Sequence, residues 1–296
     1  MSMEREKFIC STGEEFSVIN FKAKNPTKSF LFFHATGFNA LTYKIFLESL
    51  FKKFGKNINI LAIDLRGHGM SLAKKDPELL SSWSIYVNDC IEWIDSLQGD
   101  LVLSGHSMGA IIASRLAHAR PKKVKKLIML EPVLFSPFNS YKFRLLSKIK
   151  GFSRSSDMIN AASRRRYKFS STKEIIDSYE GRGAFTTWSK PWIENYVAGG
   201  SKKETTGGIV LTCHPSWESK TFSTSAMDNW KYLRKISCPS YVASGGINST
   251  LSRESRKSLM KLGNNWVLQY FPDATHFLPM EKTETLIDQI YEFVSK

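Results

Sequence analysis

Apolar residues gather in short β-rich runs that alternate with longer amphipathic stretches. Six of these runs are expected to be buried strands: Phe30–Phe33, Ile58–Ile63, Leu101–Ser104, Lys126–Leu130, Tyr241–Ala243 and Trp266–Phe271. Between them, Trp83–Leu97 carries its apolar residues on one helical side, and Ala110–Ala119 contains no helix breaker. Strands that alternate with helices of this length predict an α/β fold with a largely parallel sheet and right-handed crossovers.

Two segments depart from this alternation. Lys7–Lys22 contains a Thr12-Gly13 turn and predicts an antiparallel hairpin at the start of the chain. From Pro132 onward, the next strand-like run is the short Ile209–Leu211. We therefore predict a core domain of residues 1–131 and 235–296, with residues 132–234 inserted between two core strands and folded against the strand ends.

The net charge of +15 raises nucleic acid or a membrane surface as partners. Between Val133 and Lys235 there are 18 Lys and Arg residues against 8 Asp and Glu residues, so most of the excess lies in the insertion. No nucleic-acid recognition motif accompanies it, and the densest run, Arg164–Arg166 with Lys168, reads as a solvated helix face. We expect no specific nucleic-acid binding, although the basic insertion could favour an anionic small-molecule substrate.

The remaining composition is that of an ordinary globular protein. The chain is 42% hydrophobic and has no apolar run long enough for a membrane span. Its N-terminus lacks the apolar stretch of a secretory signal, so a cytoplasmic location is expected. The four cysteines are far apart and match no metal-binding spacing, which predicts reduced thiols and no metal. Monomer and homodimer both remain open.

The run Gly105–Gly109, Gly-His-Ser-Met-Gly, carries the strongest chemical signal. It follows the expected strand Leu101–Ser104 and precedes a helix that begins near Ala110. A serine on a tight strand-to-helix turn needs small residues two positions before and after it, because larger side chains would collide with the neighbouring backbone. The sequence therefore predicts Ser107 as a nucleophile at a helix N-terminus, where negative charge is stabilised.

Serine needs an adjacent base to become a useful nucleophile. His276 follows the last expected strand and precedes the C-terminal helix, so its loop can reach the sheet edge where Ser107 lies. His106 lies within the strand-to-helix turn that carries Ser107, and its side chain is expected to point away from the site. His276 is therefore the predicted base.

These motifs together resemble the α/β-hydrolase superfamily over the whole chain apart from the insertion. Asp64–Ser71 looks like the family's D-x-R-G-x-G-x-S loop, and Phe33–Phe38 is similar to its oxyanion loop, with Ala35 in place of the usual glycine. His276–Glu281 looks like the final H-x-x-x-x-E element. The resemblance implies a mostly parallel eight-stranded sheet flanked by helices, with a helical cap inserted after strand six and no metal or cofactor.

The acidic member of the expected triad departs from the family pattern. The loop Ser244–Thr250, where the family usually places its acid, has no carboxylate and carries Asn248 instead. Glu131 ends the preceding core strand, and some relatives, notably the dehalogenase branch, take their acid from that strand end. We predict Glu131 as the third member, with Asn248 as an alternative orienting group and a structural role for Glu131 as another.

The resemblance also implies an oxyanion hole made by the backbone N–H groups of Met108 and Thr36. In the insertion and its neighbourhood, Arg182, Trp188 and Phe38 are candidate substrate contacts. Arg182 could bind a carboxylate or pair with an acid of the cap, and Trp188 could pack inside the cap instead.

A serine nucleophile excludes the aspartate-dependent chemistry of dehalogenases and points to acyl transfer. We predict a serine esterase for small to medium apolar carboxylic esters, working through an acyl-enzyme. A carbon–carbon bond hydrolase or a lactonase on the same fold is the first alternative. A non-catalytic ligand-binding protein of this fold is the second.

Overall fold

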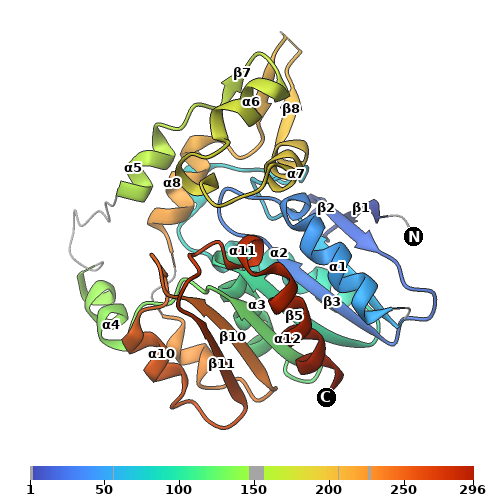
Figure 1. Cartoon of the computed structure of the whole chain (residues 1–296), viewed down its shortest axis with the longest axis vertical. Helices are drawn as coiled ribbons and strands as arrows, with labels where there is room; N and C mark the ends of the chain where they lie inside the picture. Colours follow the sequence, from blue (N-terminus) through green and yellow to red (C-terminus); the bar gives the residue numbers. More distant parts are fainter. Residues whose placement is uncertain (1–2, 56, 147–156, 206, 226–227) are drawn as a thin grey trace.

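Eight strands form one sheet in the computed structural model, which describes residues 3–55, 57–146, 157–205, 207–225 and 228–296 (Figure 1). In spatial order they are β1 (Met3–Ile9), β2 (Glu15–Phe21), β4 (Ile58–Ile63), β3 (Lys28–Phe33), β5 (Asp100–His106), β6 (Val124–Leu130), β10 (Ser240–Gly245) and β11 (Trp266–Phe271). Strand β2 pairs antiparallel with β1 and with β4, and the other pairs are parallel. The predicted hairpin and the mostly parallel eight-stranded sheet are confirmed.

Helices cover both faces of the sheet. They are α1 (Lys44–Phe54), α2 (Ser84–Ser96), α3 (Met108–Ala119), α10 (Arg253–Leu259), α11 (Leu278–Glu281) and α12 (Thr283–Ser295), with the 3-10 turns η1 (Ala40–Tyr43) and η2 (Pro77–Leu79). Along β3, Leu31 and Phe33 join the core formed with α2 and α3, whereas Phe30 and Phe32 join the core formed with α1 and α12. This burial on both faces explains why the central strands are continuous apolar runs in the sequence.

The segment between β6 and β10 folds into helices and a small sheet. Its elements are α4 (Pro137–Leu146), α5 (Asp157–Ser163), β7 (Lys168–Phe169), α6 (Thr172–Tyr179), η3 (Gly183–Phe185), α7 (Lys190–Gly200), β8 (Ser201–Lys203), β9 (Ile209–Leu211), α8 (Pro215–Ser223) and α9 (Trp230–Leu233). Strands β7, β9 and β8 form an antiparallel sheet in that order. Parts of the predicted insertion, residues 147–156, 206 and 226–227, lie outside the described residues.

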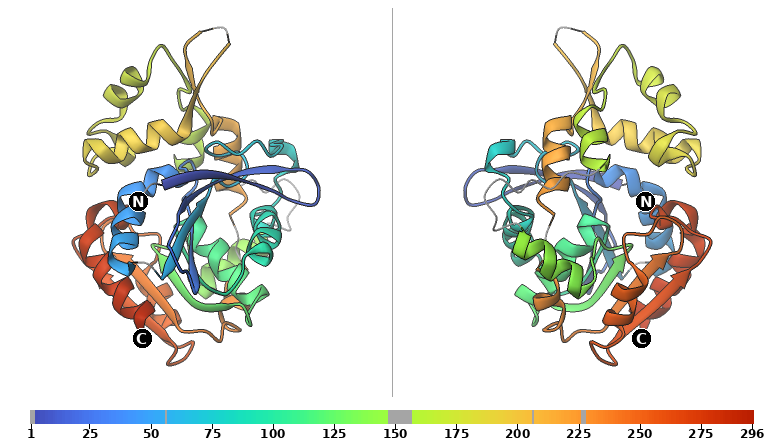
Figure 2. Two further views of the ribbon diagram at one scale, coloured as in Figure 1. Left: turned by 90° about the vertical axis from the view of Figure 1, so that its right-hand side faces the viewer. Right: turned by 90° about the vertical axis from the view of Figure 1, so that its left-hand side faces the viewer.

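Most of this segment gathers at one end of the molecule, whereas α4 lies apart from the rest of it (Figures 1 and 2). Hydrogen bonds connect the inserted segment to the loops that follow β3 and β4. The Asn39 side-chain amide donates a hydrogen bond to the Tyr196 carbonyl at 3.0 Å, and the Trp217 indole N–H donates to the Arg66 carbonyl at 3.0 Å. The inserted segment therefore packs on the edge of the sheet where the parallel strands end.

That edge contains the point at which the strand order reverses. Strand β3 lies between β4 and β5, so the loops that leave β3 and β5 diverge to opposite sides. In open α/β sheets, ligands bind in the crevice formed at such a point. The loops beginning at His34 and Ser107 occupy this position.

The structure also describes the state of the four cysteines and the apolar character of the helices. Cys10, Cys90 and Cys213 are buried, Cys238 is half-buried, and all four are free thiols. Within the described ranges, none of the helices combines the length and the apolar character required to cross a bilayer.

Candidate active site

Ser107 occupies a strained turn between β5 and α3. Its backbone has φ 58° and ψ −116°, a conformation that non-glycine residues rarely adopt and that costs about 1–3 kcal/mol. The Ser107 N–H donates to the carbonyl of Leu130, the last residue of β6, at 3.0 Å. The serine therefore projects from the sheet edge directly before the N-terminus of a helix.

The two glycines of the motif are required by close packing around this turn. A Cβ atom at Gly105 would collide with the backbone of Gly109, and one at Gly109 would collide with the backbone of Phe33. The two glycines let β5, α3 and β3 approach one another closely. The structural reason predicted for the Gly105–Gly109 spacing is confirmed.

Glu131 and His276 meet at the same edge. Glu131 is completely buried, directly follows β6, and accepts a hydrogen bond on Oε2 from His276 Nδ1 at 3.0 Å. Because a carboxylate can only accept there, Nδ1 carries the proton, and Nε2 is the nitrogen that can accept one in the neutral tautomer.

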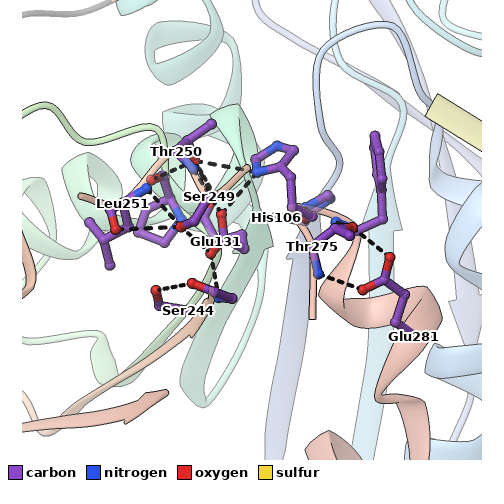
Figure 3. Close-up of polar contacts among 12 residues, drawn as sticks. His106, Glu131, Ser244, Ser249, Thr250, Leu251, Thr275 and Glu281 are labelled. Carbon is purple, nitrogen blue, oxygen red and sulfur yellow. Dashed lines mark hydrogen bonds and ion pairs between the residues drawn. The ribbon is translucent and has the colours of Figure 1, made fainter. Parts of the chain in front are cut away.

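Every other partner of the Glu131 carboxylate is also a donor (Figure 3). Oε1 accepts from the Gly245 N–H and from the Ser249 hydroxyl at 2.7 Å, and Oε2 accepts from the Thr250 N–H at 3.2 Å and its hydroxyl at 3.3 Å. Burial raises the pKa of Glu131, but hydrogen bonds from His276, Ser249 and Gly245 outweigh that effect, so its pKa lies below the ordinary value of 4.5. The site holds an ionised carboxylate.

The lowered pKa makes a prediction about stability and pH. A group whose folded-state pKa is lowered stabilises the fold above its unfolded pKa, here about 4.5, and loses that contribution as the pH falls through the folded value. Urea unfolding should therefore show wild type more stable than Glu131→Gln at neutral pH, with the difference shrinking below about pH 4.5. A difference in unfolding free energy that stays constant from pH 7 to pH 3 would contradict the lowered pKa.

Asn248 does not reach this cluster. Its side chain is exposed, whereas its neighbours Ser249 and Thr250 both donate to Glu131. The loop after β10 thus supplies donors to a carboxylate that comes from β6. A Ser-Thr pair in a loop has no distinctive spacing, so the sequence did not identify these two residues as partners of Glu131.

A second carboxylate holds the loop that bears His276. Glu281 accepts from the Thr275 N–H at 2.7 Å on Oε2 and from the Thr275 hydroxyl on Oε1 (Figure 3). Its Oε1 also accepts from the Thr187 hydroxyl at 2.6 Å. Thr187 belongs to the inserted segment. The glutamate therefore ties the histidine loop to that segment, next to Trp188.

The residues predicted for the oxyanion hole lie together. The Thr36 hydroxyl is 3.4 Å from the Met108 sulfur. Met108 is the first residue of α3, where a backbone N–H has no partner within the helix and the helix dipole favours negative charge. Two loops that are far apart in sequence thus meet beside Ser107.

One aromatic side chain of the inserted segment, Trp188, packs against the loops after β3 and β11. The ring centroids of Phe38 and Trp188 are 5.2 Å apart, and Trp188 and Phe277 are 5.8 Å apart. Trp188 is buried, and its indole nitrogen has no hydrogen-bond partner among the described residues. Arg182 is exposed and precedes η3, so its predicted contact with substrate stays a prediction.

The prediction that Arg164–Arg166 and Lys168 form a solvated helix face is wrong. Helix α5 ends at Ser163, and the half-buried Arg165 lies 2.9 Å from the buried Glu218. Glu218 in turn packs against Gly37 in the loop after β3. Three consecutive arginines look alike in sequence, and only the packing of α8 decides which one packs against a buried acid.

Metal ligands do not gather near this site. Across the ranges that the structure describes, no group of three or more His, Cys, Asp or Glu side chains could hold a metal ion. The polar groups that meet at the sheet edge are instead a serine, a histidine, a glutamate and backbone N–H groups. This set suits nucleophilic attack with proton transfer.

Comparison with known proteins agrees with the fold. Residues 30–289 match the alpha/beta hydrolase family. The chain belongs to that family. The chain is therefore a member of a hydrolase family, and the match covers the sheet from β3 to β11 with its flanking helices.

Individual alpha/beta hydrolases show partial similarity. A Mycoplasma genitalium protein named as an esterase/lipase is 28% identical over 64% of this chain and 68% of its own length. Human monoglyceride lipase is 31% identical over 31% of this chain and 32% of its own. Except for the Mycoplasma protein, the matched regions span about a third of these curated relatives.

Two solved structures share the fold across the whole chain. An E-2-(acetamidomethylene)succinate hydrolase superposes with a TM-score of 0.77 at 19% identity and covers all of both chains. An esterase from Mycobacterium tuberculosis superposes with a TM-score of 0.73 at 18% identity, covering 100% of this chain and 92% of its own. At this identity the likeness extends to the fold alone.

Proposed function

We propose that this alpha/beta hydrolase is a serine esterase that cleaves small to medium apolar carboxylic esters. The observation that carries the proposal is the 3.0 Å contact between His276 Nδ1 and the buried Glu131, at the sheet edge where the strained Ser107 turn lies. In this proposal Ser107 is the nucleophile, His276 the base and Glu131 the acid that orients the imidazole.

The reaction would proceed through an acyl-enzyme. Ser107 Oγ attacks the ester carbonyl carbon while His276 Nε2 accepts the hydroxyl proton, and the N–H groups of Met108 and Thr36 bind the oxyanion. Loss of one such donor costs about 2.7–4 kcal/mol in related chemistry. His276 then gives the proton to the leaving alcohol, and a water molecule activated by the same histidine hydrolyses the Ser107 ester.

Glu131 has two tasks in this scheme. Its contact with Nδ1 fixes the tautomer in which Nε2 can accept a proton, and its charge stabilises the imidazolium that forms. The five hydrogen bonds around the carboxylate support both tasks, because they hold it ionised and prevent rotation.

The substrate preference rests on the inserted segment. We propose that residues 132–234 form a cap over Ser107, and that Trp188 and Phe38 supply an apolar wall for the acyl or alcohol group. The named esterase and lipase relatives support an ester substrate, and the aromatic packing supports an apolar one.

A panel of p-nitrophenyl esters of graded acyl length tests this proposal, with Ser107→Ala measured beside wild type. We expect turnover that peaks at short to medium acyl length and a burst of p-nitrophenol when deacylation is slower than acylation. Activity on vinylogous diketones without ester turnover would favour the carbon–carbon hydrolase, and preferred hydrolysis of cyclic esters would favour the lactonase. A ligand-induced rise in melting temperature without turnover would favour the non-catalytic alternative.

A further inference from the structure

His106, the residue directly before Ser107, is completely buried and bonded at both ring nitrogens. Nε2 lies 2.8 Å from the backbone carbonyl oxygen of His276, and Nδ1 lies 2.7 Å from the Tyr43 hydroxyl. The same hydroxyl accepts a hydrogen bond from the Ala35 N–H at 3.2 Å. Tyr43 is also completely buried.

The direction of these hydrogen bonds is fixed by chemistry. A backbone carbonyl can only accept, so His106 Nε2 carries the proton and donates to His276. In a neutral ring Nδ1 then accepts, and Tyr43 donates to it while accepting from Ala35. Burial, with a smaller contribution from the neighbouring His276, lowers the pKa of His106 well below its usual range, which agrees with a neutral ring.

This chain of donors joins three parts of the candidate site that are far apart in sequence. Ala35 precedes Thr36 in the oxyanion loop, His106 precedes the nucleophile, and the carbonyl that accepts from His106 belongs to the predicted base. The His106 and His276 rings also lie 4.9 Å apart, so His106 contacts both the backbone and the side chain of that residue.

We propose that His106 and Tyr43 are positioning residues that fix the His276 backbone and the oxyanion loop relative to Ser107. The inference rests on the proposed serine chemistry and adds to it two residues that touch neither substrate nor the reacting atoms. Both His106 nitrogens are already bonded, so His106 does not compete with His276 as a base.

The expected effect falls on the chemical step. A displacement of about 1 Å in a reacting group can cost on the order of 100-fold in rate. We therefore expect kcat to fall about 10-fold in Tyr43→Phe and about 100-fold in His106→Leu, with KM within a factor of about three. His106→Gln should recover most of the loss, because its amide can donate to the His276 carbonyl and accept from Tyr43.

Tyr241→Phe is the matched control. The Tyr241 side chain is also buried, and its hydroxyl donates to Gln289 at 2.6 Å on the side of the sheet covered by α12. Both tyrosine variants lose one buried hydroxyl and should lower the melting temperature by similar amounts. Only Tyr43→Phe should change kcat and the rate at which a fluorophosphonate modifies Ser107.

The experiment measures kcat, KM, melting temperature and the fluorophosphonate labelling rate for wild type and these four variants. If wild type is labelled at Ser107 and Tyr43→Phe matches Tyr241→Phe in kcat and labelling rate, the positioning role is overturned. Failure of His106→Gln to exceed His106→Leu at equal melting temperature would overturn the role of the donor to His276. Absence of labelling in wild type would instead overturn the proposed nucleophile, a result distinct from both.

Discussion

Ser107→Ala is expected to lower kcat on the order of a million-fold and to leave a folded protein. The substitution removes the atom that attacks the carbonyl, and the remaining groups can offer substrate only binding and oxyanion stabilisation. Alanine has no branched side chain that would worsen the φ 58° turn, so stability should change little. Steady-state hydrolysis of the best ester in the panel, with the melting temperature, measures both effects.

Ser114→Ala is the matched control for this variant. Ser114 is a buried serine of α3, the helix that follows Ser107, and its hydroxyl donates to the Ile111 carbonyl at 2.7 Å within that helix. Its loss should lower stability slightly without reducing kcat. Equal activity of Ser107→Ala and Ser114→Ala would show that Ser107 is not the nucleophile.

Glu131→Gln is expected to lower kcat about 10,000-fold with a much smaller change in KM. All the contacts of this carboxylate are donors, so the amide NH2 group of glutamine faces a donor in either orientation. If the amide faces His276, Nδ1 must become the acceptor, and Nε2 then carries the proton where it should accept one from Ser107. The charge that stabilises the imidazolium is lost as well.

Asn248→Ala separates the two candidate positions for the acid. Its side chain is exposed, and the neighbouring donors to Glu131 are backbone and hydroxyl groups of Ser249 and Thr250. We expect kcat to stay within a factor of about three. A severe loss in Asn248→Ala with a mild one in Glu131→Gln would move the orienting group to the loop after β10.

The strands of the sheet and the motifs that follow them could be predicted because both depend on local sequence patterns. Ile58–Ile63 and Trp266–Phe271 form strands with the predicted bounds. A continuous apolar run between turns suits a strand buried on both faces, as β4 is, whereas β11 is an edge strand on which Val267 and Tyr270 are exposed. The contact between Glu131 and His276 was expected from the resemblance to relatives whose acid ends this strand, together with the place of His276 in the loop after the last strand.

Long-range partners in the loops and the insertion could not be predicted. Nothing in the periodicity distinguishes the half-buried Arg165 from its exposed neighbours, because its burial depends on Glu218 from a helix about fifty residues later. The three-stranded sheet of β7, β9 and β8 was seen only as the single run Ile209–Leu211, since strands of two or three residues leave no alternation to detect.

The partners of His106 could not be predicted either, although His106 belongs to the recognised Gly105–Gly109 motif. His106 was expected to point away from the site, whereas its ring bonds to the carbonyl of His276 and lies 4.9 Å from the His276 ring. Its partner Tyr43 lies in the turn η1, which has no motif of its own. Only the fold shows that one hydroxyl connects Ala35 to His106.

Mass spectrometry of the folded protein after treatment with a fluorophosphonate tests the central claim most directly, because this reagent reacts with a serine that an adjacent base activates. The account predicts a single adduct on the peptide that contains Ser107, absent from Ser107→Ala, slowed in Glu131→Gln and lost when the protein is unfolded first. An unmodified Ser107 in folded wild type, or an adduct on another residue that persists in Ser107→Ala, would contradict it.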